Sequence, residues 1–138
     1  MRHTVLVSGC WNIALCFFVF TACQVLTPES RELLGIRNPG IFWTLILCGV
    51  LLVTGAVLVL ASRDLVSRGS IVYYEGLARL CAAALLFSRG VAELGSLAIV
   101  IAVPDLCFGL LQVIALPAAI GRTPRQLLLD TRDARRTS

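Results

Sequence analysis

The chain has 138 residues and a formal net charge of +4; 58% of its residues are hydrophobic and only 14% are charged. A soluble domain is nearer to roughly half apolar and a quarter charged, so this shortage of ionic groups excludes a soluble fold of this size. Every basic side chain is Arg, and the arginines gather at the ends of apolar stretches. This placement favours anionic lipid head groups, rather than nucleic acid, as the partner of the positive charge.

Four apolar stretches are each long enough to cross a bilayer, which takes roughly 20 residues of helix. The spans are predicted at about 4–26, 41–61, 70–87 and 94–120, and an Arg-rich tail follows at 122–138. We therefore predict an all-α protein, a four-helix transmembrane bundle over residues 1–121, embedded in the lipid bilayer of the cell membrane.

The first span has an alternative interpretation. Arg2 followed by an apolar run is also typical of a signal peptide, and the segment FTAC at 20–23 partly resembles a bacterial lipoprotein processing site. Lipidation at Cys23 would leave three spans and an external N-terminus. The six cysteines form no Cys-x-x-Cys pair and all lie in apolar spans, so we interpret them as small hydrophobic side chains.

Two segments outside the spans carry helix-start signals. Thr27 and Pro28 offer an N-cap followed by proline at the first helical position, and Gly35 would end that helix. Thr123 and Gln126 have the spacing of a capping box. The leucines and arginines around this box predict a tail helix that rests on anionic lipid, and the alternative is a solvated tail.

Three charged residues lie inside the predicted spans, where a charge costs about 2.5–3.5 kcal/mol on insertion scales and usually faces the bundle interior. Glu75 precedes Arg79 by four residues in the third span, the favourable order for an ion pair, and Asp105 lies in the fourth. A count of about 1.5 Å per residue places Arg79, Asp105 and Asn12 at a similar depth, roughly 10–13 Å from one membrane face. Gln112 follows two turns beyond Asp105 on the same face.

This polar layer is a candidate binding site with two interpretations. In the functional one, Arg79 binds an anion or controls a proton on Asp105 or Glu75. In the structural one, the same residues form an ion-pair network that fixes the order of the helices. Pro104 adds an irregularity next to the layer, because it leaves the carbonyl of Val100 without its helical donor.

Several kinds of site lack their residues. The only histidine is His3, at the N-terminal end, so neither a pair of facing haem ligands nor a zinc ligand set is present. No Gly-x-Ser-x-Gly elbow and no phosphate-binding loop occur. We predict no metal, no cofactor and no nucleophile-based catalytic site.

The segment YEGLARL at 74–80 contains a Gly-Leu-x-Arg sequence, and the last span contains Pro104, Asp105 and Gln112. In these features and in its four-span layout, the chain resembles the small DoxX-like membrane proteins and their uncharacterised relatives. That wider family has no single agreed activity, so the resemblance implies a fold and a membrane location rather than a reaction.

Three functions remain open. We favour an accessory membrane subunit that binds a protein partner or a second copy of itself, because the loops are short and small residues permit close helix contact. The second is a small proton- or anion-coupled transporter that uses Glu75, Arg79 and Asp105. The third is a membrane enzyme for a lipid or quinone-like substrate, with the carboxylates as acid and base.

The distribution of arginines predicts the orientation of the bundle. One side would carry Arg2, Arg63, Arg68, Arg122, Arg125, Arg132, Arg135 and Arg136, and the other Arg31, Arg37 and Arg89. Because the richer side is normally cytoplasmic, both termini are predicted to lie in the cytoplasm.

Reporter fusions test this orientation. A reporter joined after Gly35 is expected to be active outside the cytoplasm, and one joined after Ser138 is expected to be active inside it, because one predicted span precedes Gly35 and four precede Ser138. Reporter enzymes that are active in only one compartment provide the measurement. Two reporters on the same side would contradict the four-span topology.

Overall fold

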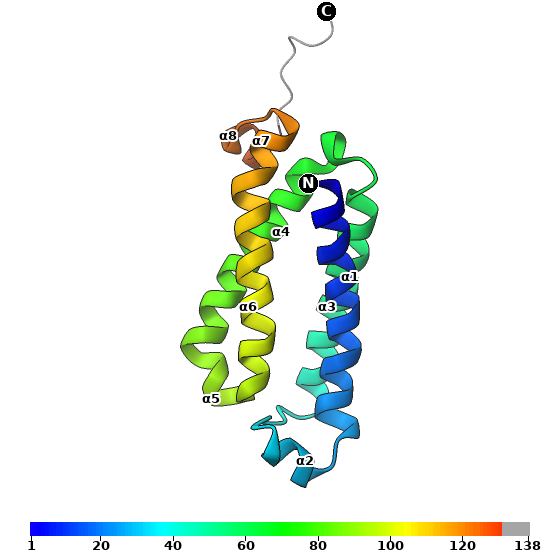
Figure 1. Ribbon diagram of the computed structural model, residues 1–138, viewed down its shortest axis with the longest axis vertical. Coiled ribbons are helices and arrows are strands. Elements are labelled where there is room, and N and C mark those ends of the chain that lie inside the picture. The colour runs from blue at the N-terminus through cyan, green and yellow to red at the C-terminus, as the bar shows by residue number, and fades with distance from the viewer. Residues whose placement is uncertain (131–138) are drawn as a thin grey trace, which may run out of the picture.

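The computed structural model describes residues 1–130, and helices make up nearly all of this part of the chain (Figure 1). Within it, four helical stretches are long and apolar enough to cross a membrane: Arg2–Val25, Ile41–Ala61, Leu65–Leu94 and Ser96–Ile120. The predicted fold class, an all-α bundle, is confirmed. The composition and length of the four helices are compatible with a multi-pass membrane protein.

Three of the four spans contain a π-helical segment. The first span is α1 (Arg2–Phe20) followed by η1 (Thr21–Val25), and the second is α3 (Ile41–Ala61). The third consists of α4 (Leu65–Leu85), η2 (Leu86–Gly90) and α5 (Val91–Leu94), and the fourth of α6 (Ser96–Leu110), η3 (Leu111–Ala115) and α7 (Leu116–Ile120). The short helices α2 (Pro28–Leu33) and α8 (Pro124–Leu128) lie outside the spans.

The third span is longer than predicted, because it covers 65–94 rather than 70–87. Its helix begins early because the Asp64 side chain accepts a hydrogen bond from the Ser67 backbone N–H at 3.1 Å. Arg68 fits this first turn because its side chain reaches back to the Leu60 carbonyl at 2.8 Å. The span ends at Gly95, whose φ of +64° takes the chain out of helical geometry.

Both predicted helix starts outside the spans are present. The Thr27 hydroxyl accepts from the Ser30 N–H at 3.3 Å and caps α2. At α8, the Thr123 hydroxyl accepts from the Gln126 N–H at 3.2 Å, and the Gln126 side chain accepts from the Thr123 N–H at 2.7 Å. These two bonds are the predicted capping box.

Helix α8 packs against the bundle. Leu127 is fully buried, Tyr74 donates its hydroxyl to the Leu128 carbonyl, and Ser70 lies 2.6 Å from the Asp130 carboxylate. The start of the predicted tail is therefore bound to α4 rather than solvated. Its contact with anionic lipid stays a prediction, and residues 131–138 lie outside the described part of the chain.

The four spans form two antiparallel hairpins, α1 with α3 and α4 with α6 (Figure 1). Glycines allow the backbones of each hairpin to approach closely. A methyl group placed on Gly55 would lie 2.8 Å from the Gly9 carbonyl oxygen, and one placed on Gly109 would lie 3.0 Å from that of Gly76.

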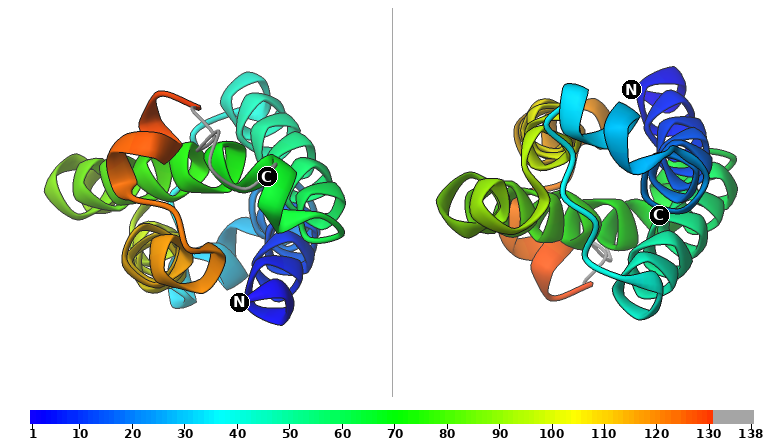
Figure 2. Two further views of the ribbon diagram at one scale, coloured as in Figure 1. Left: turned by 90° about the horizontal axis from the view of Figure 1, so that it is seen from above. Right: turned by 90° about the horizontal axis from the view of Figure 1, so that it is seen from below.

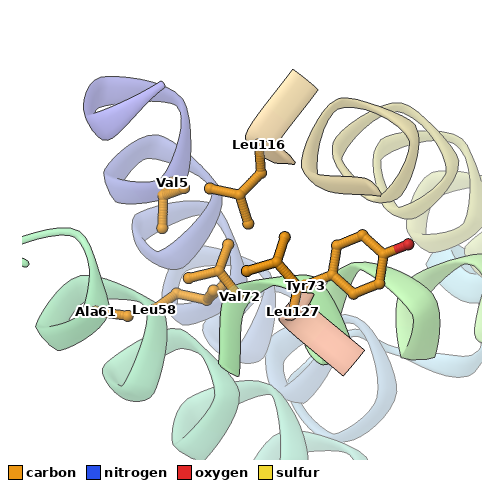
Figure 3. Close-up of a cluster of buried hydrophobic side chains, with 7 residues drawn as sticks. All are labelled: Val5, Leu58, Ala61, Val72, Tyr73, Leu116 and Leu127. Carbon is orange, nitrogen blue, oxygen red and sulfur yellow. The ribbon is translucent and has the colours of Figure 1, made fainter. Parts of the chain in front are cut away.

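The two hairpins meet at both ends of the bundle. Near the N-terminus, buried side chains of α1, α3, α4, α7 and α8 form one apolar cluster: Val5, Leu58, Ala61, Val72, Tyr73, Leu116 and Leu127 (Figure 3). At the α2 end, the Ser96 N–H donates to the Gly35 carbonyl at 3.0 Å and the Arg37 N–H donates to the Leu94 carbonyl at 3.2 Å. Between these ends, the third span runs obliquely across the bundle (Figure 2).

The glycine contact within the first hairpin gives a stability test. Gly55→Ala is expected to lower the unfolding free energy by about 1–3 kcal/mol, because the new methyl group meets the Gly9 backbone. Gly49→Ala on the same helix points into open space, and is expected to leave stability unchanged or raise it by up to about 1 kcal/mol. Unfolding of the detergent-solubilised protein measures both values. Equal effects of the two changes would show that the close contact is unimportant.

Candidate functional site

Arg79 lies in the middle of the bundle with 4% of its side chain exposed, and its three guanidinium nitrogens contact three different residues. Nε lies 2.5 Å from Glu75 Oε1, and Nη1 lies 2.6 Å from Asp105 Oδ1. Nη2 donates to Asn12 Oδ1 at 2.8 Å. The structure thus brings four of the five predicted site residues together, and we call these four the Arg79 cluster.

The folding of each hairpin explains how the cluster forms. Glu75 and Arg79 are one turn apart on α4, and the close approach of α4 to α6 places Asp105 beside them. Asn12 comes from α1, and its Nδ2 donates to Thr54 Oγ1 of α3 at 2.9 Å. All four spans are therefore joined through one guanidinium group.

Two neighbours of the cluster were not predicted. Thr54 fixes the Asn12 amide, and the Phe108 ring lies with its centroid 5.6 Å from the Arg79 guanidinium carbon. Such a contact attracts a cation to the face of the ring. A threonine or a phenylalanine in an apolar span carries no distinguishing signal, although the spacing of Phe108 from Asp105, three residues along α6, puts both on one helix face.

Gln112, the fifth predicted residue, lies beside the cluster. It is fully buried, packs against Gly76 and donates from Nε2 to the Ser8 hydroxyl at 3.3 Å. Its Oε1 has no hydrogen-bond donor among the described residues. Gln112 therefore extends the polar layer towards Ser8 of α1; its amide lies next to the Glu75 carboxylate, and no contact with Arg79 is found among the described residues.

The cluster has more negatively charged groups than positively charged ones. Two carboxylates face one guanidinium, so with both carboxylates ionised the group carries one surplus negative charge. Glu75 Oε2 is buried and, within residues 1–130, has no hydrogen-bond donor. A buried acceptor without a donor is costly, so the arrangement favours the arrival of a proton, a cation or another donor.

A cavity of about 330 Å³ opens beside the cluster, between α3 and α4. Glu75, Arg79, Asp105, Asn12 and Thr54 line its polar part. Its walls are apolar and come mainly from α3 and α4: Leu47, Val50, Leu51, Ala78, Ala82, Leu85, Leu86 and Ile101.

A second cavity, of about 510 Å³, continues from the first towards the α2 end. It shares Leu47 and Val50 with the first cavity and also contacts Trp43 and Glu93. The exposed fractions of Trp43 and Val50 are 60% and 54%, so the two cavities open along the side of the bundle. We call the two cavities together the α3/α4 groove.

The geometry limits the chemistry available to the cluster. Both carboxylates are bound by Arg79, which orients them; among the described residues, Glu75 Oε2 and the neighbouring Gln112 Oε1 are buried acceptors without a donor in hydrogen-bond geometry. Among the described residues, no group of three or more His, Cys, Asp or Glu side chains has the arrangement of a metal site. The cluster is therefore suited to binding and holding a polar group.

Comparison with known proteins finds no family model, curated protein or solved structure that matches the chain. The resemblance to DoxX-like proteins stays a prediction.

Removal of the Arg79 guanidinium tests how much the cluster contributes to the stability of the bundle. Arg79→Leu strands two carboxylates and is expected to lower the unfolding free energy by about 3 kcal/mol or less, because membrane proteins tolerate the loss of polar partners better than soluble proteins do. Arg79→Leu combined with Glu75→Gln and Asp105→Asn removes all three charges and is expected to recover most of that loss. Unfolding in detergent gives the values.

Arg89→Leu is the matched control for this series, because Arg89 lies in the same span but is exposed. It is expected to have little effect on stability. A neutral Arg79→Leu variant would contradict a structural role for the guanidinium.

Proposed function

We propose that this chain is a multi-pass protein of the cell membrane that binds a small amphipathic molecule in the α3/α4 groove. The observation that carries the proposal is the position of the Arg79 cluster, which forms the polar end of a cavity with otherwise apolar walls. Small-molecule sites are typically cavities of about 300–1,000 Å³ with apolar walls and a few fixed polar groups. Charged residues within a membrane likewise tend to face a cavity or a pathway.

The groove is exposed along one side, which supports the entry of an amphipathic molecule from the bilayer. Ile46, Val50 and Leu85 are apolar and exposed, so they would contact lipid chains in a membrane. A molecule with an alkyl chain can move from lipid into such a groove without exposing that chain to water. Its polar group would then replace water contacts with contacts to the cluster.

The distribution of arginines supports an orientation for this site. With both termini in the cytoplasm, the α2 end lies outside, and the groove runs from the outer side towards the cluster. Of the three functions predicted from the sequence, this proposal is nearest to the small transporter. The cluster differs from the anion site considered there, because both carboxylates already bind the Arg79 guanidinium.

Trp43 provides a built-in reporter of groove occupancy, because it lines the groove whereas Trp11 lines a separate cavity. In the Trp11→Phe background, reconstituted in nanodiscs, bromine-labelled amphiphiles such as 11-bromoundecanol and 11-bromoundecylamine are expected to quench Trp43 fluorescence. The expected quenching contains a saturable component, because the groove holds a limited number of molecules.

Ala82→Phe fills the groove and is expected to abolish the saturable component, since Ala82 lies on the groove wall. Ala84→Phe is the matched control, because Ala84 is exposed on the same helix and does not line the groove. A purely linear response for every probe, or equal effects of the two substitutions, would refute the proposal.

An accessory subunit is the second candidate, and the open side of the groove favours it. The apolar side chains that line the groove, Ile46 and Leu85 among them, would also accept a helix of a partner protein. Gentle solubilisation followed by purification distinguishes the two functions. A stoichiometric membrane partner that is lost in Ala82→Phe but kept in Ala84→Phe would favour the accessory role.

A further inference from the structure

The polar end of the α3/α4 groove is better suited to a donor than to an acceptor. Each of the three Arg79 nitrogens already contacts an oxygen, on Glu75, Asp105 or Asn12. The ring of Phe108 lies against the same guanidinium. An incoming anion would add a second surplus negative charge to the cluster.

An incoming cation meets the opposite situation. Glu75 lines the groove, and its buried Oε2 has no donor in hydrogen-bond geometry within residues 1–130, although the Gln112 amide lies next to the carboxylate. The buried Oε1 of Gln112, which packs against the neighbouring Gly76, also lacks one there. One monovalent cation makes the total charge of Arg79, Glu75 and Asp105 zero, which matters most where the local dielectric constant is low.

We propose that the groove is selective for a lipophilic ammonium compound, whose N–H groups donate to Glu75 while its apolar chain lies between α3 and α4. This inference rests on the proposed function and specifies the class of molecule bound. A primary ammonium group supplies both features that the site lacks, a positive charge and several donors. Hydrogen bonds between charged groups are shorter and stronger than neutral ones, so the charge adds selectivity over an alcohol.

The length of the groove fits a single alkyl chain. Thr54, beside the cluster, and Trp43, near the α2 end, are eleven residues apart on α3, which corresponds to about 16 Å along the helix. The walls between them are apolar, with Leu47 and Val50 common to both cavities. A chain with its ammonium group at Glu75 therefore extends past Arg79 towards Trp43, and Glu93 is the next charged residue that lines the groove.

Three probes with the same chain and different head groups test this selectivity: 11-bromoundecylamine, 11-bromoundecanol and 11-bromoundecanoate. Each is titrated into zwitterionic nanodiscs that contain the Trp11→Phe protein. The saturable quenching of Trp43 is compared at equal concentrations of probe in the membrane. These concentrations are determined from the partitioning of each probe into protein-free nanodiscs. The amine is expected to reach half-saturation at a concentration at least about tenfold below that of the alcohol, and the carboxylate is expected to bind most weakly.

Glu75→Gln identifies the group responsible for the preference. The Gln side chain still offers an oxygen to Arg79 Nε but removes the surplus charge, so the preference for the amine over the alcohol is expected to fall to about twofold or less. Glu93→Gln is the matched control, because Glu93 lies at the far end of the groove and is exposed. It is expected to leave most of the preference intact.

The outcomes separate this inference from the proposed function. Saturable binding of all three probes with equal strength, or the strongest binding by the carboxylate, overturns the ammonium selectivity while amphiphile binding stands. A preference for the amine that disappears in Glu93→Gln and persists in Glu75→Gln also overturns it. Attraction of the ammonium group to Glu93, at the far end of the groove, would then explain the preference. If no probe shows saturable quenching, the proposed function itself fails. Unfolding measurements on both variants check that each is folded.

Discussion

The buried guanidinium of Arg79 fixes how the helices of this bundle are rotated against one another. Apolar contacts between helices are weakly specific in lipid, since lipid chains are as apolar as the side chains. A guanidinium is different because it is rigid and planar and its donors point in set directions. Its contacts to Glu75, Asp105 and Asn12 can form together only when α1, α4 and α6 are correctly rotated, and Thr54 then fixes α3 through Asn12.

The same arrangement leaves space for the groove. Glycines hold each hairpin together, and the hairpins join at an apolar cluster near the N-terminus and at backbone hydrogen bonds at the α2 end. Between these two junctions the oblique third span presents the small side chains of Ala78 and Ala82 to the cavity. Larger residues at these two positions would fill the space beside the charges. Their small size therefore fits a cavity that has to stay open better than it fits a tightly packed core.

Much of this arrangement followed from the sequence, because charges in an apolar span are few and their depth can be counted. The fold class, both helix caps and the meeting of Asn12, Arg79 and Asp105 all follow from local patterns of this kind. The close glycine contacts, the groove and the ends of the third span did not follow. These features depend on how helices tilt and pack. In sequence, Gly55 looks no different from Gly49, at which an added methyl group would meet no atom within 4 Å. Small residues predict close contact between helices, but Ala78 and Ala82 of α4 line the groove.

Two carboxylates against one guanidinium favour a binding site over a purely structural cluster. A network needed only to fix the helices would be most stable with one carboxylate for one guanidinium, because any surplus charge in a low-dielectric interior raises the free energy of the fold. Here Asp105 joins α6 to Arg79 and Asn12 joins α1, so the helices would stay connected without the carboxylate of Glu75. Glu75 nevertheless lines the groove with one oxygen bound to Arg79 and the other without a donor in the described part of the chain. Local features that lower stability without helping the fold tend to occur at functional sites. By this argument, Glu75 is the residue whose presence is best explained by a ligand.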